Sequence, residues 1–256
     1  MYKKLKMKTV IAILGRNAEK TLEKTYLEIP KEYRKNVFLS DDNSTDSTLE
    51  IARKLKLKVY RNPRAGGYGS NAKNCFNSAI KEGADIIVIL HSDNQYDATK
   101  IPAMVKLIDG GKADFAIGSR MIGDRKGLKK MPLYRYLGNR GLTIFENVIM
   151  GTKVKDFHSG LMAIRAETAK KIPYHLNYDD YTFHSEIVVQ TRMAGGKFGE
   201  VGIPTRYDNE SHSTSLSHTM AYGFRTLEIL WRYIMHKTGI KKHPSFEIKP
   251  EKSRDK

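Results

Sequence analysis

The sequence has little of several features that mark particular classes of protein. Cys75 is the only cysteine in 256 residues, so no disulfide can form within the chain, and a reducing compartment fits this usage. It lies in a helical pattern, which favours a buried packing role over a reactive one. No apolar run approaches the roughly 18 to 20 uncharged residues that a membrane-spanning helix needs. We therefore expect a soluble or peripheral protein.

We also do not expect a secretory signal peptide. The first residues, MYKKLKMKTVIAIL, place basic side chains before an apolar run. That run ends before Gly15 and is shorter than the roughly 7 to 15 apolar residues of a signal peptide. The expected location is cytoplasmic, with peripheral association at the cytoplasmic face of a membrane as a further possibility.

Acidic residues are scarce relative to basic ones. Asp and Glu total 28 against 45 Lys and Arg, which gives a formal charge of +17. Nucleic acid, acidic membranes and phosphorylated small molecules are all attracted by such a surface, and charge alone does not choose among them. Hydrophobic residues make up 40% of the chain, which suffices for the core of one large domain and argues against global disorder.

Apolar strand-like runs alternate with helical patterns in the first half of the chain. Strands are expected at residues 10–14, 37–40, 58–60, 85–90 and 115–118, and helices at 18–29, 45–55, 69–82 and 99–109. Continuously hydrophobic strands joined by helices predict a mostly parallel, Rossmann-like α/β sheet with helices on both faces. Polar clusters follow the first, second, fourth and fifth strands. Because ligands of such sheets bind beyond the carboxyl ends of the strands, we expect a site at that edge.

The second half of the chain differs in character. Helices are expected at 132–150 and 181–194, and strands at 157–165 and 197–203. A longer amphipathic pattern runs from Leu216 to Lys237, interrupted by Arg225, Glu228 and Arg232. Such a helix can lie on a membrane but cannot cross one. We therefore expect a main domain over residues 1–215, followed by an amphipathic C-terminal helix with a basic tail over residues 216–256.

Two adjacent aspartates, Asp41 and Asp42, directly follow the second expected strand in LSDDNSTDST. Capping of the next helix explains part of the segment from Asn43 to Asp46. It does not explain two carboxylates at the mouth of the sheet. A carboxylate there can accept a hydrogen bond from the imino N–H that uracil and guanine possess, so contact with a nucleotide base is the alternative role.

The cluster HSDNQYD follows the most apolar strand and carries the stronger signal. His91, Asp93 and Gln95 alternate, so an extended backbone would place all three side chains on one side. One nitrogen and two oxygen ligands suit Mn²⁺ or Mg²⁺ chelated together with a diphosphate. A polar turn after a buried strand is the plainer explanation, but the two aspartates expected at the same edge favour a metal site.

Basic residues farther along the chain are expected near the same edge of the sheet. Arg120 follows the fifth strand, and Arg135 and Arg140 lie on the next expected helix, so guanidinium groups near a metal could grip a phosphate bidentately. His212 lies in a polar loop, where it is either a metal or phosphate contact or an ordinary loop residue.

The remaining candidate site residues are two carboxylates and a glycine-rich turn. Asp180 and Glu186 are candidates for a general base toward an acceptor hydroxyl, although Asp180 fits the start of a helix equally well. The turn Gly66-Gly67-x-Gly69 lacks the Lys-Ser/Thr pair of a P-loop. We interpret it as a flexible turn near a nucleotide.

In this order along the chain, these segments resemble the glycosyltransferases of family 2 with the GT-A fold, and among them the polyprenyl-phosphate sugar transferases. AILGRNAEKTL is similar to the opening Pro-x-Tyr-Asn-Glu segment of that family, DDNSTDST to its Asp-Asp-x-Ser-x-Asp loop, and HSDNQYDATKIP to its Asp-x-Asp-x-Gln metal motif. GSRM, KDFHSGLMAIR and GGKFGEVGIPTRY resemble later blocks. The resemblance extends over residues 8–215. It identifies the family but says little about which sugar donor and which acceptor are used.

The resemblance implies roles for the candidate residues. The nucleotide-sugar donor would be bound by Leu14, Arg16, Asn17, Asp41, Asp42, Ser92 and Asp93, the divalent cation by His91, Asp93 and Gln95, and an acceptor phosphate by Arg120, Arg135, Arg140 and His212. Catalysis would fall to Asp93, Arg120, Asp180 and Glu186.

Two departures from the family pattern bear on these roles. His91 replaces the first aspartate of the metal motif, and imidazole suits Mn²⁺ better than Mg²⁺. Leu14 and Arg16 stand where proline and tyrosine are usual, which affects the expected contacts to the base.

We therefore expect an inverting transferase that moves a sugar from a UDP- or GDP-sugar to polyprenyl phosphate at an acidic membrane surface. Transfer to a sugar hydroxyl of a glycan is the alternative, and it would require a carboxylate base. Two other classes remain: a transferase-like protein that binds nucleotide sugar without turnover, and a basic nucleic-acid-binding protein. Nucleic acid is not the expected partner, because the basic residues are dispersed and no recognised binding module appears.

Overall fold

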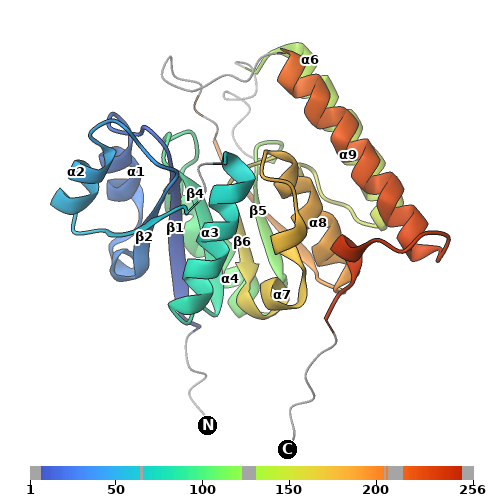
Figure 1. Ribbon diagram of the computed structural model, residues 1–256, viewed down its shortest axis with the longest axis horizontal. Helices are drawn as coiled ribbons and strands as arrows, with labels where there is room; N and C mark the ends of the chain where they lie inside the picture. Colours follow the sequence, from blue (N-terminus) through green and yellow to red (C-terminus); the bar gives the residue numbers. More distant parts are fainter. Residues whose placement is uncertain (1–6, 64–65, 123–130, 205, 207–215, 250–256) are drawn as a thin grey trace, which may run out of the picture.

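The computed structural model describes residues 7–63, 66–122, 131–204, 206 and 216–249. They form an α/β structure around a seven-stranded sheet with the strand order β3-β2-β1-β4-β6-β5-β7 (Figure 1). The strands are β1 (Thr9–Gly15), β2 (Val37–Asp41), β3 (Lys58–Arg61), β4 (Ile86–His91), β5 (Phe115–Ser119), β6 (Met162–Arg165) and β7 (Phe198–Gly202). Within these residues β6 pairs antiparallel with β4 and β5, and the other pairs are parallel. The expected mostly parallel sheet is confirmed.

The strand sequences explain why helices cover both faces of the sheet. In β1, Val10 and Ala12 pack into one apolar core, whereas Ile11 and Ile13 pack into a second. Side chains of a strand alternate between the two faces, so a strand that is apolar throughout must be buried on both. Helices α3 (Tyr68–Lys81), α8 (Thr182–Met193) and α9 (Leu216–Lys237) contribute to the first core, and α1 (Leu22–Glu28), α2 (Thr48–Lys54) and α4 (Ile101–Asp109) to the second.

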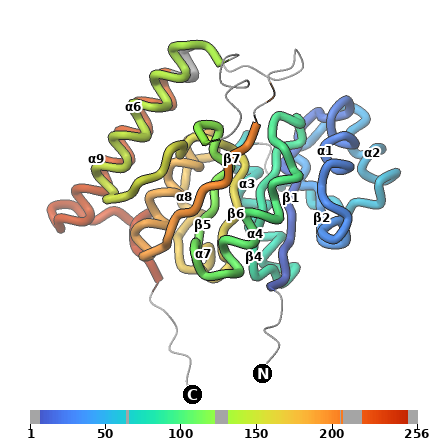
Figure 2. Tube along the Cα trace, turned by 180° about the vertical axis from the view of Figure 1, so that it is seen from behind, coloured from blue at the N-terminus to red at the C-terminus, as the bar shows by residue number. Residues whose placement is uncertain are grey.

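Two further helices complete the described structure, together with short 3₁₀ turns. α6 (Leu133–Met150) contacts α9, and Figures 1 and 2 show the two helices side by side at one end of the sheet. Short elements carry little periodicity, so the sequence pattern does not predict them. They are α7 (Ala166–Lys171) and the 3₁₀ turns η1 (Lys31–Asn36), η3 (Tyr174–Leu176) and η4 (Pro244–Phe246). A further 3₁₀ turn, η2 (Ala98–Lys100), leads into α4. Among the described residues, no helix combines the length and the apolar character needed to cross a bilayer.

Several expected elements are shorter in the structure. The strand expected at 157–165 is limited to β6, because the preceding residues form a loop in which the His158 carbonyl accepts a hydrogen bond from Arg120. The helix expected at 18–29 begins at Leu22. The division of the chain into residues 1–215 and 216–256 remains a prediction.

Candidate functional site

The polar tips of β2 and β4 lie on either side of the end of β1. Gly15 is in register with Asp41 of β2, and Leu14 is in register with His91 of β4. Just beyond β4, the amide of Ser92 donates to the Leu14 carbonyl at 3.0 Å. Neighbouring strands are about 4.8 Å apart, so strands separated by one other lie about 10 Å apart. The structure therefore brings the two polar segments to one edge of the sheet.

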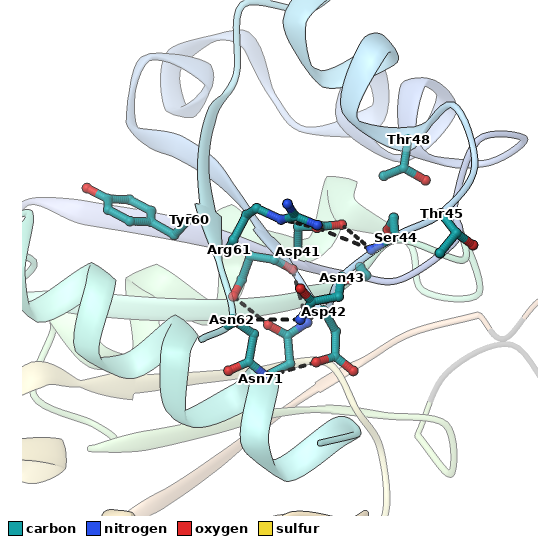
Figure 3. A network of polar contacts seen from close by, with 12 residues as sticks. Asp41, Asp42, Asn43, Ser44, Thr45, Thr48, Tyr60, Arg61, Asn62 and Asn71 are labelled. Atoms are coloured by element: carbon teal, nitrogen blue, oxygen red, sulfur yellow. Dashed lines mark hydrogen bonds and ion pairs between the residues drawn. The ribbon is translucent and has the colours of Figure 1, made fainter. Parts of the chain in front are cut away.

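Asp41 is fully buried and holds the loop that follows β2 (Figure 3). Its carboxylate oxygens accept the amide of Ser44 at 3.2 Å, and one of them lies 3.5 Å from Nε of Arg61 in β3. These contacts fix the loop through hydrogen bonds from its backbone to a buried side chain. Direct contact between Asp41 and a nucleotide remains a prediction.

Asp42 is also buried, but its partners come from the segment after β3. Its carboxylate accepts hydrogen bonds from Asn62 Nδ2 at 2.8 Å and from the amide of Gly67 at 3.3 Å (Figure 3 shows the Asn62 contact). Arg16, in the loop after β1, approaches the same carboxylate at 3.8 Å. Gly67 has a φ of 91°, which residues with a side chain rarely adopt. The glycine turn thus lies beside Asp42 and directs a backbone amide at it.

Asn17 joins the loops that follow β1 and β2. Its side-chain oxygen accepts the amide of Thr45 at 2.9 Å, and its own amide donates to Ser44 Oγ at 2.9 Å. Its φ of 50° lies in the left-handed region that asparagine tolerates. Three of the predicted donor-binding residues are Leu14 at the end of β1 and Arg16 and Asn17 in the loop after it. That loop is thereby tied to the loop after β2.

The loop before α8 rests on the start of α3. The amide of Gly69 donates to the Asp179 carbonyl at 2.7 Å. A Cβ at Gly69 would lie 2.3 Å from the Tyr178 carbonyl oxygen, so a larger residue would displace the loop. This close approach lets Tyr181 stack on Tyr68, with ring centroids 5.0 Å apart.

The segment after β4 is a turn rather than an extended strand. Asn94 has a φ of 57°, and the amide of Gln95 donates to Asp93 Oδ1 at 3.0 Å. The expectation that an extended backbone aligns His91, Asp93 and Gln95 is therefore wrong, because a left-handed residue reverses the chain between them. Asp93 and Gln95 are half-buried on this turn.

His91 is packed among aromatic rings behind the turn. Its ring lies 5.4 Å from that of Tyr68 and 5.3 Å from that of Tyr96, both edge to face. A Cβ at Gly160 would come within 2.6 Å of His91 Nε2, and that nitrogen is buried without a hydrogen-bond partner among the described residues. Burial lowers the pKa of His91, which favours the neutral imidazole.

Arg120, just beyond β5, is held by a buried carboxylate. Its Nε and one terminal nitrogen lie 2.8 and 2.9 Å from the two oxygens of Asp156, and the terminal nitrogen also donates to the His158 carbonyl at 3.0 Å. Burial alone would raise the pKa of Asp156, but the charge and hydrogen bonds of Arg120 outweigh it and lower the value to about 2. Asp156 therefore stays ionised and fixes the guanidinium at the edge of the sheet.

A second buried ion pair adjoins the same loop. His158 Nε2 lies 3.1 Å from the Glu146 carboxylate of α6, and Nδ1 lies 2.9 Å from the Tyr222 hydroxyl of α9. Burial alone would lower the pKa of His158, but Glu146 outweighs it and raises the value to about 10. The ring is therefore a cation at neutral pH that links α6 and α9 to the loop holding Arg120.

The other predicted phosphate contacts lie on α6 or outside the described residues. Arg140 donates to the Lys155 carbonyl at 3.3 Å, and the guanidinium of Arg135 lies 6.0 Å from the centre of the Tyr134 ring. His212 lies outside the described residues. Their joint role in phosphate binding remains a prediction.

The two candidate bases both have structural contacts. Asp180 accepts the amide of Thr182 at 2.8 Å, which supports the start of α8, and its carboxylate is paired with Arg225 of α9. Glu186 is buried and accepts the amide of Tyr178 at 2.7 Å. Burial raises the pKa of Glu186 to about 7. A role for either residue as a general base remains a prediction.

The raised pKa of Glu186 predicts a measurable dependence of stability on pH. The pKa of Glu186 is higher in the folded protein than its ordinary 4.5. The contribution of this carboxyl to stability is therefore fully present below pH 4.5 and is lost as the pH rises through about 7. Glu186→Gln should therefore exceed the wild type in unfolding free energy by roughly 2–3 kcal/mol at pH 8 and match it near pH 4.5. Urea unfolding at both pH values tests this. Glu167→Gln, at a half-exposed position, is the control and should show no such divergence.

The described residues contain no group of three His, Cys, Asp or Glu side chains that could hold a metal ion. A nucleotide site needs no such group, because Mg²⁺ is usually held there by one or two carboxylates together with substrate phosphates and water. Asp93 is half-buried at the tip of β4, so its carboxylate fits this role.

Polar side chains at the carboxyl ends of several parallel strands are typical of α/β proteins that bind a ligand at that edge. The chain belongs to a particular family of such proteins, glycosyl transferase family 2, whose model matches residues 10–172. The protein is therefore a glycosyltransferase. The matched range includes the tips of β1, β2, β4 and β5.

Two relatives cover most of the chain. The uncharacterised protein MJ1222 of Methanocaldococcus jannaschii is 35% identical over 221 residues, which is 86% of this chain and 88% of that protein. The UDP-N-acetylglucosamine–dolichyl-phosphate N-acetylglucosaminyltransferase of Methanococcus voltae is 26% identical over 87% of this chain and 93% of that protein.

Solved structures confirm the GT-A fold. Glucosyl-3-phosphoglycerate synthase from Mycobacterium tuberculosis in complex with UDP matches with a TM-score of 0.67 and 18% identity over 89% of this chain and 80% of that chain. The same enzyme with Mn²⁺, UDP and glucosyl-3-phosphoglycerate matches with a TM-score of 0.64 and 16% identity over 92% of this chain and 81% of that chain. At such identities the likeness concerns the fold.

Proposed function

We propose that this protein transfers a sugar from a UDP- or GDP-sugar to a polyprenyl phosphate, with inversion at the anomeric carbon. The observation that carries the proposal is the placement of Asp42 and Asp93 just beyond two strands that flank β1 at one edge of the sheet. Family membership supplies the reaction class. The name of the Methanococcus voltae relative supports UDP in the donor and a lipid phosphate as the acceptor.

In this proposal the loops after β1 and β2 bind the nucleoside. A carboxylate accepts a hydrogen bond from the imino N–H of uracil or guanine, and Asp42 and Asp41 are the candidates for that contact. Arg16 is exposed next to Asp42, and its guanidinium can contact a donor bound at this loop. Asn17 acts indirectly, by holding the two loops together.

The reaction is a single in-line displacement. An oxygen of the acceptor phosphate forms a bond to the anomeric carbon while the bond from that carbon to the diphosphate breaks, and the electron pair leaves with the nucleoside diphosphate. A phosphate monoester is already anionic near neutral pH, because its second pKa is about 6, so the acceptor needs no strong base. Arg120, fixed by Asp156, stabilises negative charge on the phosphates.

A divalent cation, Mn²⁺ or Mg²⁺, would be held by Asp93 and Gln95, and when bound it would stabilise charge on the departing diphosphate. With Nε2 turned against Gly160, His91 serves chiefly to support the turn that carries Asp93. The remaining ligands would then come from the diphosphate and water.

A thermal-shift panel tests the donor. UDP-, GDP-, ADP- and CMP-sugars are compared with and without Mn²⁺, because a ligand that binds the folded protein raises its melting temperature with saturation. We expect a Mn²⁺-dependent rise with UDP- or GDP-sugars. No rise with any nucleotide sugar would contradict the proposal.

The choice between a phosphate and a hydroxyl acceptor is tested at Asp180. An acceptor hydroxyl needs a general base, whereas a phosphate does not, so Asp180→Asn should retain transfer to a polyprenyl phosphate within a few fold. Asparagine can still accept the Thr182 amide, which keeps the start of α8. A loss of about a hundredfold or more would instead favour the glycan-hydroxyl alternative.

A further inference from the structure

The turn that carries Asp93 and Gln95 is held by Arg206, which is not among the site residues predicted from the sequence. Arg206 follows β7 and is 112 positions away from Asn94. Its backbone amide donates to the Gln95 carbonyl at 3.2 Å. One terminal nitrogen of its guanidinium lies 3.1 Å from Asn94 Oδ1 and 3.4 Å from the Asn94 carbonyl oxygen. Arg206 therefore contacts two successive residues of the turn, through both its backbone and its side chain.

The oxygens of Asn94 need such a donor because they lie beyond the sheet and are shielded from water. Pairing of β4 with β1 ends at His91, and Asn94 is buried, with a left-handed φ of 57°. A buried polar group without a partner costs free energy comparable to a lost hydrogen bond. Arg206 supplies the missing bonds and so favours this one conformation of the turn.

A carboxylate on α1 fixes the guanidinium in turn. The nitrogen that contacts Asn94 also lies 2.7 and 2.8 Å from the two oxygens of Glu28. Both side chains of this pair are partly buried, at 31% exposed for Arg206 and 21% for Glu28. Glu28 also balances the charge of Arg206, which would otherwise repel a cation held at the neighbouring Asp93.

The same helix holds the other side of the turn. Thr25 lies one turn before Glu28 on the same side of α1. Thr25 is buried, and its hydroxyl donates to the Ser92 carbonyl at 3.1 Å. Asp93 thus stands between two residues, Ser92 and Asn94, that are each fixed by contacts from outside the turn.

We infer that Arg206 is a positioning residue for the divalent cation. It acts through Asn94 and Gln95, by keeping the turn in the conformation in which the Gln95 amide donates to the Asp93 carboxylate. The inference rests on the proposed function and deepens it, because the cation is the one assigned there to Asp93 and Gln95. Groups that orient the residues around a metal typically alter metal affinity by about 10- to 100-fold when they are replaced.

Arg206→Gln removes the guanidinium and its ion pair but leaves the backbone contact to Gln95. The full-length protein is titrated with UDP by calorimetry, with and without Mn²⁺. The affinity for UDP in the presence of Mn²⁺ should fall about 10- to 100-fold, whereas the affinity without metal should stay within about twofold of the wild type. Excess Mn²⁺ should restore the transfer rate to within about threefold, because a positioning residue changes the occupancy of the cation.

Arg206→Lys is the conservative variant. One nitrogen of Arg206 makes the contacts to both Glu28 and Asn94, so a single ammonium group can replace much of them. This variant should retain the Mn²⁺-dependent affinity for UDP within about fivefold of the wild type. Recovery with lysine but not with glutamine would show that the charged donor holds the turn.

Arg165→Gln is the matched control. Arg165 lies 3.0 Å from Asp114, and the two side chains are 21% and 27% exposed, close to the values of the Arg206 pair. Arg165 is in register with Ile86, at the start of β4 and the opposite edge of the sheet. This variant should bind UDP and Mn²⁺ like the wild type.

Hydrogen exchange followed by mass spectrometry tests the hold on the turn without any ligand. Peptides covering residues 92–97 should exchange at least about tenfold faster in Arg206→Gln than in the wild type, because local opening of the turn becomes easier. The same peptides should exchange at the wild-type rate in Arg165→Gln.

Unchanged exchange of residues 92–97 in Arg206→Gln would overturn the inference, and so would an unchanged affinity for UDP in the presence of Mn²⁺. Equal losses in Arg165→Gln would also overturn it, because the effect would then reflect general destabilisation. A loss of UDP affinity that is just as large without metal would assign Arg206 to the nucleotide instead. Faster exchange in Arg206→Gln, together with a wild type that binds no nucleotide sugar, would overturn the proposed function alone.

Discussion

The Asp93→Asn protein is expected to lose sugar transfer by about a hundredfold or more, because the carboxylate proposed to hold the divalent cation becomes a neutral amide. The fold should persist, since an asparagine oxygen can still accept the Gln95 amide. Binding of UDP in the presence of Mn²⁺ should weaken, whereas binding without metal should change little. Initial rates and calorimetric titrations with and without Mn²⁺ measure both effects.

Asp97→Asn is the matched control for this substitution. Asp97 lies four positions farther along, is buried, and accepts the amide of Thr99 at 3.0 Å as a cap for η2. It should retain transfer close to that of the wild type and lose about 1 kcal/mol of stability at most. Full metal-dependent activity in Asp93→Asn, or an equal loss in Asp97→Asn, would refute the role assigned to Asp93.

The second large effect is expected in stability. Asp156→Asn removes the buried charge that balances Arg120, whose side chain is 11% exposed. It should lower the free energy of unfolding by about 3–5 kcal/mol at neutral pH. The pKa of Asp156 is lowered from its ordinary 3.8 to about 2. Its contribution is therefore present above 3.8 and lost as the pH falls toward 2, so wild type and variant should converge in acid. Urea unfolding across this range measures the difference.

Asp114→Asn is the control for Asp156→Asn, because it breaks an ion pair that is partly exposed rather than buried. Asp114 lies 3.0 Å from Arg165 at the opposite edge of the sheet, and both side chains are partly exposed. We expect a loss of about 1 kcal/mol or less and no change in transfer. Asp156→Asn should in addition lower the transfer rate, because Arg120 is no longer fixed. Equal losses of stability in the two variants would show that burial of the Arg120 pair is not decisive.

The sheet and the edge that carries the candidate site follow from local patterns. β1 is apolar at nearly every position and ends at Gly15, which indicates a buried parallel strand with a polar tip. Because parallel strands share one carboxyl edge, the order of the tips alone predicts that Asp41 and Asp93 approach each other. Register in the structure places the two strand ends on either side of β1.

Contacts between distant residues could not be predicted in this way. Arg120 and Asp156 are separated by 36 positions, and no local pattern links them. The left-handed conformation of Asn94 also depends on its surroundings, and it overturns the simple alternation expected from His91 to Gln95. One usable signal existed: Glu146 stands among apolar residues on α6, and a carboxylate on the buried side of a helix requires a partner.

The most direct test of the central claim is a crystal structure with UDP and Mn²⁺, in which anomalous scattering locates the manganese. We expect the manganese beside Asp93, the diphosphate at the end of β1, and the uracil toward Asp42. Manganese and UDP bound at another edge of the sheet, or a base bound away from the loop after β2, would contradict it.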